Sequence, residues 1–381
     1  MDIMNSLLPL LKAISHNQQN LNIDGADTQL INFATDSGMA VYLKYCAQKS
    51  VDNLPTDNKN KILAAELTVK IITNTLLKAL KEILKSSDQC HDDIILLKGI
   101  AHAQSIYPSP WFRIMSDIDI LVSEFDSKVL NIILLNLGYV QTSHNPQAYY
   151  DEHHHCMPYY NKKNNIWIEV HTHLFSNTTD VKHDKLFHLQ NILNSTYPIE
   201  KKSYNKNIKQ LAPELHLIYT CVHWAEDYNL HKTCIQFTDI ILLINNTNMD
   251  WNIINKWLNN TASASSVFLA LSYLNSANII QIPQSFFDHC QLKNKNMGLI
   301  NRTILYKIID NYLLGKTQYS KRLNENNLKI IWSTLLKPNS SFINLFLVIN
   351  NLIFPPDNKN KFKAKYTFNR ILKLFYTQKN D

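Results

Sequence analysis

The chain has 381 residues, is 45% hydrophobic and carries a formal net charge of +7, so it has enough apolar content for more than one buried core. Its six glycines are too scattered for a glycine-rich dinucleotide loop or a P-loop, which excludes Rossmann and P-loop ATPase folds. Its six cysteines include no Cys-x-x-Cys pair, so neither a zinc ribbon nor a disulfide framework is expected.

The N-terminus has neither the basic region nor the cleavage site of a secretory signal, and scattered cysteines are typical of a reducing compartment. The most apolar late segment, 343–354, contains asparagines and is too short to span a bilayer. We therefore expect a cytoplasmic protein with no transmembrane segment, and a buried helix at 343–354.

Residues 1–87 are predicted to form an N-terminal helical layer. Over 62–84, apolar residues recur at roughly helical spacing and predict a stripe that faces the core. The scarce glycine and the long helical periods predict an α+β protein that is mostly helical and has one small sheet. The residues of the predicted stripe are Leu63, Leu67, Ile71, Leu76, Leu80 and Ile83 or Leu84.

The segment 92–97 is typical of a buried strand, and Lys98-Gly99 lies where this strand gives way to a helix. Glycine in such a turn lets the backbone approach a phosphate, and the following helix N-terminus favours anions. Lys98 and Arg113 would add positive charge near a triphosphate.

In the next predicted strand, 115–122, Asp117 and Asp119 alternate with apolar residues. Successive side chains of a strand point to opposite faces, so the two carboxylates share one face. Mg²⁺ usually binds one or two carboxylates together with substrate phosphates. An Asp-x-Asp pair alone is more often a solvated face, and the flanking Lys98-Gly99 turn favours a site.

A third carboxylate follows in a predicted hairpin, whose strands 155–160 and 166–171 flank a polar turn. Before it, a helix at 125–137 with a left-handed cap at Gly138 and a strand at 139–142 are expected. A neighbouring strand in register would bring Glu169 beside Asp117 and Asp119. Three acidic groups on one face repel one another unless a cation neutralises them.

Two groups of histidines have competing interpretations. His171 shares the strand face of Glu169 and could bind metal or contact phosphate. It could also orient Glu169 without touching the metal itself, and this last role is preferred. The run 153–155 is three histidines, which could ligate a soft metal. Three consecutive residues of an extended segment cannot all face one ion, so a surface loop is favoured.

From Pro213 onward the pattern is again helical. His216 and His223, with Trp224 and Asp239, could line a nucleotide cleft, and a packed helix is an equally good interpretation. The basic segment 359–379 could serve nucleic acid, an acidic membrane or solubility, and a solvated tail is preferred. The predicted division is an N-terminal helical layer at 1–87, a catalytic domain at 88–200, and a helical domain with a basic tail at 201–381.

In their order, these motifs resemble the nucleotidyltransferases of the DNA polymerase β superfamily. More closely, the chain resembles the bacterial family of uncharacterised nucleotidyltransferases, in which Leu-Lys-Gly replaces the Gly-Ser turn of the superfamily. The matching segments are Leu97-Lys98-Gly99, 113–122, Leu137-Gly138-Tyr139, 168–171, 211–216, 221–223, 237–239, 352–356 and Lys365-Tyr366.

The resemblance implies a small mixed polymerase β-like sheet flanked by helices. It implies that Asp117, Asp119 and Glu169 are catalytic and bind metal, Mg²⁺ or else Mn²⁺. The nucleotide would be bound by Lys98, Gly99, Arg113 and Ser116. The departure from Gly-Ser removes a hydroxyl that other members aim at the triphosphate.

The function implied is Mg²⁺-dependent transfer of a nucleoside monophosphate from a nucleoside triphosphate such as ATP, with release of pyrophosphate. The acceptor could be a small molecule, a peptide or protein, or RNA. One alternative is a toxin or phage-defence enzyme that adds nucleotides to tRNA, for which the basic tail is the independent support. Another is a non-catalytic nucleotide-binding scaffold, against which the three carboxylates count.

Overall fold

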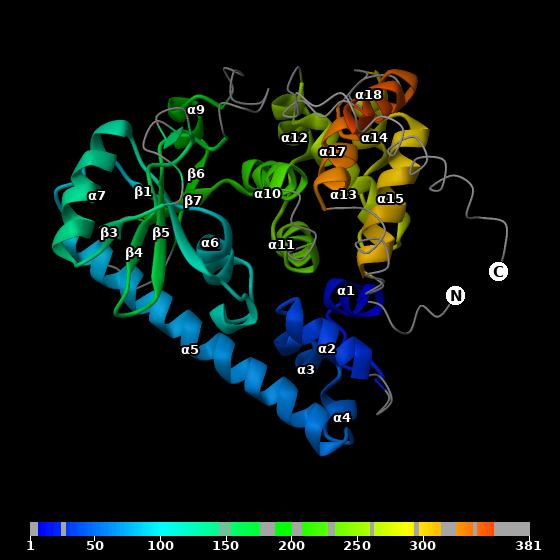
Figure 1. The fold of residues 1–381 in the computed structure, drawn as a ribbon, viewed down its shortest axis with the longest axis horizontal. Helices are drawn as coiled ribbons and strands as arrows, with labels where there is room; N and C mark the ends of the chain where they lie inside the picture. Colours follow the sequence, from blue (N-terminus) through cyan, green and yellow to red (C-terminus); the bar gives the residue numbers. More distant parts are fainter. Residues whose placement is uncertain are drawn as a thin grey trace.

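The structure is a computed structural model and describes residues 7–23, 28–143, 145, 149–150, 153–175, 187–199, 208–227, 233–259, 263–292, 297–313, 325–337 and 341–353. The fold is α+β and mostly helical, as the sequence predicts, and the strands among these described residues form one mixed sheet (Figure 1). The sheet lies at one side of the molecule, and the helices that follow it in the chain lie at the other (Figure 1).

The N-terminal part is helical as predicted and ends in one helix of 31 residues, α5. This helix buries residues at both of its ends but in two different cores. Ile62 belongs to the larger core with the other N-terminal helices, whereas Leu76 and Leu80 belong to the core beneath the sheet. The helices are α1 (Leu8–Ser15), α2 (Thr28–Asp36), α3 (Ala40–Cys46), α4 (Gln48–Val51) and α5 (Thr56–Ser86).

The predicted core-facing stripe of α5 is wrong in its first half. Leu63, Leu67 and Ile71 are exposed, the last two by 59% and 58%, although the helix itself is confirmed. The reason is that α5 crosses from the N-terminal helices to the sheet as a long diagonal (Figure 1). A helical stripe is buried only where another element lies against it, and along the middle of α5 the buried positions are Val69 and Thr73 instead.

Seven strands form the sheet, in the order β3-β4-β5-β2-β1-β7-β6. The predicted hairpin is confirmed as the antiparallel pair β4–β5, although its first strand is shorter than predicted. The last two strands were not predicted from the sequence. The strands are β1 (Ile94–Leu96), β2 (Asp117–Leu121), β3 (Val140–Gln141), β4 (Tyr159–Asn161), β5 (Ile166–His171), β6 (Thr196–Pro198) and β7 (Ile208–Leu211).

The central strands β2 and β5 run parallel, with Asp119 opposite Glu169 and Ile120 opposite Val170. Ile118, Ile120 and Val170 are fully buried in the core that also receives α5 and α7 (Glu124–Asn136). Because strand side chains alternate, the acidic residues of β2 and β5 lie on the opposite face. The helix α7 ends with Gly138 at φ +82°, the left-handed cap that the sequence predicts.

The C-terminal helices begin with Pro213, the first residue of α10, as predicted. They share one apolar core with the N-terminal helices, and α1 packs directly against α11. The elements outside the sheet are α6 (Lys98–Ser105), η2 (Pro110–Phe112), α9 (Leu189–Leu193), α10 (Pro213–Asp227), α11 (Thr233–Asn246), α12 (Trp251–Leu258), α13 (Ala264–Ser276), α14 (Gln284–Leu292), α15 (Leu299–Leu313), α17 (Glu325–Leu335) and α18 (Ser341–Ile353).

The apolar segment near the end forms α18, but it is not the buried helix that the sequence predicts. Ile343 and Phe346 are exposed, while Asn344 is buried and donates a hydrogen bond to the carbonyl of Lys337 at 2.9 Å. Among the described helices, none combines the length and the apolar character needed to cross a membrane. The predicted basic tail lies outside the described residues, and the predicted domain boundaries stay predictions.

Candidate active site

The chain turns from β1 into α6 at Leu97, so Lys98 and Gly99, the first two residues of α6, lie at the end of the sheet; we call this place the Lys98-Gly99 turn. Lys98 has φ +47°, a left-handed conformation that is uncommon and costly for a side chain of this kind. Gly99 allows a close approach, since a Cβ atom here would lie 3.0 Å from Met115 Cγ and 3.5 Å from Arg113 Cζ. The amide of Leu97 donates to the carbonyl of Asp119 at 3.0 Å and ties the turn to β2.

Four side chains meet on the polar face of the sheet. The Lys98 ammonium lies 2.8 Å from Asp119 Oδ1 and 3.5 Å from Glu169 Oε2. His171 Nε2 donates to Asp119 Oδ1 at 2.9 Å and lies 3.6 Å from Glu169 Oε2. We call these residues the sheet cluster: Lys98, Asp119, Glu169 and His171.

Burial and charge act in opposite directions in the sheet cluster. Burial alone would raise the pKa of Asp119 and of Glu169, but the positive charge of Lys98 and the hydrogen bonds from His171 outweigh it and lower both pKa values. Burial would lower the pKa of Lys98, and the charge of Asp119 outweighs this and raises it well above its usual range. The two carboxylates and the lysine are therefore ionised at neutral pH.

Asp117 and Ser116 lie at the start of β2. Asp117 is half-buried, pairs across the sheet with Trp167, and its charge raises the pKa of both Lys98 and Arg113. It therefore adds a third negative charge to the face that carries Asp119. Ser116 is exposed and immediately precedes the strand.

The sheet cluster fits a divalent cation. Donor atoms of Asp119, Glu169 and His171 all lie within 4.8 Å of one another. Asp119 and Glu169 offer carboxylate oxygens to such an ion, and Asp117 lies on the same face of β2. Carboxylate oxygens suit both Mg²⁺ and Mn²⁺. In this structure the ammonium of Lys98 provides the positive charge beside the carboxylates.

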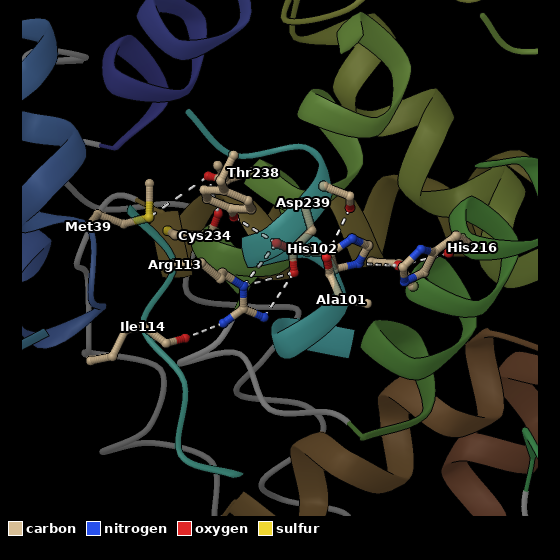
Figure 2. Close-up of polar contacts among 12 residues, drawn as sticks. Met39, Ala101, His102, Arg113, Ile114, His216, Cys234, Thr238 and Asp239 are labelled. Atoms are coloured by element: carbon tan, nitrogen blue, oxygen red, sulfur yellow. Dashed lines mark hydrogen bonds and ion pairs between the residues drawn. The ribbon is translucent and has the colours of Figure 1, made fainter. Parts of the chain in front are cut away.

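Arg113 lies next to the Lys98-Gly99 turn, but its guanidinium pairs with Asp239 of α11 and not with a residue of the sheet cluster. Its Nε is 2.9 Å from Asp239 Oδ1 and its second terminal nitrogen 2.9 Å from Asp239 Oδ2, while the other terminal nitrogen donates to the carbonyl of Ile114 (Figure 2). Tyr107 also donates to Asp239 Oδ1, at 2.7 Å. We call Arg113, Asp239 and Tyr107 the α11 cluster.

The partner of Arg113 was not predicted, because Asp239 lies 126 residues further along the chain. Burial alone would lower the pKa of Arg113, and the charge of Asp239 outweighs it and raises this pKa. The guanidinium predicted to hold phosphate is therefore largely occupied by a carboxylate from α11. Asp239 braces the turn through Arg113, and its place along a nucleotide cleft stays a prediction.

The two histidines predicted on one face of α10 have different surroundings. His216 is buried and stacks on His102 of α6, with ring centroids 3.9 Å apart (Figure 2). Burial lowers the pKa of both rings well below the usual value, so both are neutral. The packing expected of His216 is confirmed, whereas the hydrogen bond expected of such a histidine is not seen at its Nε2, which has no partner among the described residues. His223 is half-buried and stacks on Tyr219.

The three consecutive histidines lie beside the sheet cluster, which the sequence did not predict. The rings of His154 and His155 have their centroids 5.1 Å and 5.4 Å from that of His171. His155 also forms an isolated antiparallel bridge with His171. The segment bends rather than extends, and all three rings are half-buried rather than displayed on a free loop.

A cavity of about 360 Å³ lies elsewhere, lined by residues of α1, α13 and α15. Two of its polar lining residues, Tyr273 and Asp310, are joined by a hydrogen bond of 2.8 Å that the Tyr273 hydroxyl donates. It includes none of the acidic or basic groups on the sheet. The chemistry of the side chains, rather than the size of a hollow, therefore identifies the sheet face as the candidate active site.

Comparison with known proteins identifies the family of the chain. The sequence model of the family described as "uncharacterised nucleotidyltransferase" matches residues 26–277, from the segment before α2 to the end of α13. The protein is a nucleotidyltransferase, and the chain belongs to this family. No curated protein and no solved structure matches the chain.

Proposed function

We propose that the protein transfers a nucleoside monophosphate group from a nucleoside triphosphate to an acceptor, releases pyrophosphate, and depends on Mg²⁺, with Mn²⁺ as an alternative. The observation that supports this most strongly is the register of β2 and β5, which sets Asp119 opposite Glu169. Asp117 lies two residues earlier on the same face, so three carboxylates share one small area of the sheet.

Asp117, Asp119 and Glu169 would hold the cation, with His171 holding Asp119 in place through its 2.9 Å hydrogen bond. When bound, the divalent cation would neutralise charge on the phosphates and on the attacking and leaving oxygens. Lys98 stays protonated because its pKa is raised, so it supplies a fixed positive charge beside the same carboxylates.

Glu169 is the carboxylate most able to orient an acceptor hydroxyl, since its side chain is 25% exposed against 2% for Asp119. Its pKa lies well below the usual value, because Lys98 and His171 outweigh the effect of burial. A carboxylate with a low pKa accepts a hydrogen bond readily but is a weak base. We therefore assign Glu169 to orientation of the acceptor more than to removal of its proton.

The nucleotide would bind at the Lys98-Gly99 turn, where the absence of a Cβ atom at Gly99 leaves the backbone accessible. Arg113 would support this turn from behind and add positive charge there, because its donors are committed to Asp239 and Ile114. Ser116 is exposed at the start of β2 and remains a candidate for contact with the nucleotide.

The test has a binding part and a transfer part. Mn²⁺ binding is measured from the decrease in the electron paramagnetic resonance signal of the free ion. Nucleotide binding is measured from the change in melting temperature of the protein. We expect the double variant Asp117→Asn/Asp119→Asn to lose Mn²⁺ binding, and the exposed control Asp88→Asn to retain it. If the double variant binds both Mn²⁺ and nucleotide as the unchanged protein does, the assignment is wrong.

In the transfer part, each nucleoside triphosphate labelled in its α-phosphate is mixed with protein, Mg²⁺ and a cell extract. Label is then sought separately in RNA, in protein and in small molecules. Label in tRNA, with growth arrest on expression that Asp119→Ala relieves, would favour the toxin alternative. Nucleotide binding without transfer to any fraction would favour the non-catalytic scaffold.

A further inference from the structure

Beyond the carboxylate site, we propose that His153, His154 and His155 form a second metal site, which binds a divalent transition metal such as Zn²⁺. Each of the three residues has a ring nitrogen within 4.8 Å of a ring nitrogen of the other two. Imidazole nitrogens are ligands that Zn²⁺ prefers and Mg²⁺ does not. The two neighbouring sites would therefore select different ions.

The backbone of this segment is held by the sheet, so the three rings are positioned rather than free. The amide of Cys156 donates to the carbonyl of Val170 at 2.8 Å, and the amide of Thr172 donates to the carbonyl of His154 at 3.0 Å. His155 pairs with His171 through its isolated bridge. The segment bends at His153 and His154, which removes the objection that three residues in extended conformation cannot face one point.

The rings also have nitrogens available for a metal. Nδ1 of His153 and Nδ1 of His154 are buried and have no hydrogen-bond partner within the described part of the chain. Nδ1 of His155 lies 2.7 Å from the carbonyl of Cys156, and a carbonyl can only accept, so this nitrogen carries the proton. Such a bond fixes the tautomer of a metal-binding histidine and leaves the lone pair on Nε2.

The charge state suits a metal. Burial lowers the pKa of His153 to about 4, with a further contribution from His155, and burial also lowers the pKa of His154 and of His155. All three rings are therefore neutral at physiological pH, as metal ligands must be. A neutral, partly buried group of this kind has little attraction for a bare phosphate, whereas unpaired buried nitrogens are stabilised by a cation.

The distances require a modest adjustment. Zn–N bonds of about 2.1 Å in a tetrahedral site place the nitrogens roughly 3.4 Å apart. Since the nitrogens lie within 4.8 Å of one another, they would have to approach by at most about 1.4 Å. Rotation of half-buried side chains on a fixed backbone can supply this. Three histidines leave a fourth position for water or another oxygen ligand, which is the arrangement of open rather than purely structural zinc sites.

The experiment uses the full chain stripped of metal, with Co²⁺ as the probe because its visible absorption reports tetrahedral nitrogen ligation, and with Zn²⁺ as competitor. The variants are His153→Gln and His154→Gln, each tested alone. The matched control is His16→Ala, an exposed histidine just after α1. A second control is Asp119→Asn/Glu169→Gln, which removes the carboxylates of the sheet cluster and spares the three histidines.

We expect one equivalent of Co²⁺ with a tetrahedral spectrum, displaced by one equivalent of Zn²⁺, in the unchanged protein and in both controls. Each histidine variant should bind at least about tenfold more weakly, since loss of even an indirect partner of a metal costs that much. Melting temperatures without metal show which variants stay folded, and either histidine variant alone suffices for the comparison.

Two results would overturn the inference. One is a histidine variant that stays folded and binds Co²⁺ as tightly as the unchanged protein. The other is loss of the tetrahedral spectrum in Asp119→Asn/Glu169→Gln while the histidine variants keep it, which would place the metal on the carboxylates. Neither result bears on whether those carboxylates bind Mg²⁺, so the proposed function stands or fails separately.

Discussion

The sheet cluster and the α11 cluster both pair buried acidic and basic side chains, but the pairing differs between them. In the sheet cluster, one ammonium is shared between Asp119 and Glu169, and Asp117 adds a further negative charge nearby. In the α11 cluster, one guanidinium faces the two oxygens of a single carboxylate, Asp239. The second cluster is thus a one-to-one pair, whereas in the first a lysine and His171, whose pKa is raised by its hydrogen bonds to Asp119 and Glu169 although burial opposes this, are shared between two carboxylates.

This difference separates a candidate site from a structural brace. A planar guanidinium matches a carboxylate with two parallel hydrogen bonds, so little of its capacity is left for a ligand. A lysine is a point charge on a flexible chain and can be shared or displaced. The shared cluster is the one that can accept a cation, and the one-to-one pair joins the segment between η2 and β2 to α11.

The largest expected effect comes from Asp119→Asn. Nucleotide transfer should fall by about 10²–10³-fold or more, the usual loss when one group that stabilises developing charge is removed. The free energy of unfolding should change little, because Lys98 and His171 still have a carboxylate nearby. Glu169 Oε2 lies 3.5 Å from the Lys98 ammonium and 3.6 Å from His171 Nε2. Incorporation of α-labelled nucleotide and urea unfolding measure the two effects. Transfer at the unchanged rate would contradict the proposed role of Asp119.

The same substitution in the other cluster, Asp239→Asn, should act mainly on stability. It leaves the Arg113 guanidinium buried without its carboxylate, which costs about 3–5 kcal/mol in the free energy of unfolding. Urea denaturation measures this loss. The double variant Arg113→Met/Asp239→Leu removes both charges and should recover most of it. A loss under about 1 kcal/mol would show that the pair does not brace the turn.

A third comparison tests the backbone of Lys98, whose φ is +47°. Lys98→Ala and Lys98→Gly both remove the ammonium, but glycine adopts this conformation without strain, so its variant should be more stable by about 1–2 kcal/mol. In the interior of α5, Lys81→Gly should instead be less stable than Lys81→Ala, by about 1 kcal/mol. Thermal and urea unfolding of the four variants measure the order of stability of the alanine and glycine variants at each of the two positions. Equal stabilities at Lys98 would argue against strain in the turn.

The smallest effect on the free energy of unfolding is expected from a substitution of Glu66 in α5. This residue pairs with Lys44 and Lys70 in an ion cluster that is only partly buried. Burial would raise the pKa of Glu66, but the two lysines outweigh it and lower this pKa below 4.5. A lowered pKa stabilises the folded state above the unfolded pKa, and this stability is lost as pH falls through the folded pKa.

Accordingly, Glu66→Gln should lower the free energy of unfolding at neutral pH by up to about 1 kcal/mol, the range for pairs close to solvent. Well below pH 4.5 the variant and the unchanged protein should be equally stable, since Glu66 is then protonated in both states. Urea unfolding at the two pH values measures the difference. A difference that persists in acid would mean that packing, rather than charge, carries the effect.

Much of the fold followed from local patterns in the sequence. The alternation in β2 and β5 was sufficient to set their faces, and Gly138 and Pro213 marked helix ends that the structure confirms. The middle of α5 was predicted wrongly because helical spacing identifies an apolar stripe without showing where a partner covers it. The short strands β6 and β7 carried too few residues for a periodic signal.

The sequence by itself determined which side chains lie on one face of a strand or helix, because that depends on a period of two or 3.6 residues along the chain. Only the tertiary structure decided which groups meet across long separations. Asp239 pairs with Arg113, and the rings of His154 and His155 lie against His171 of the carboxylate strand. Such pairs depend on how separate elements pack, and no local period in the sequence records that.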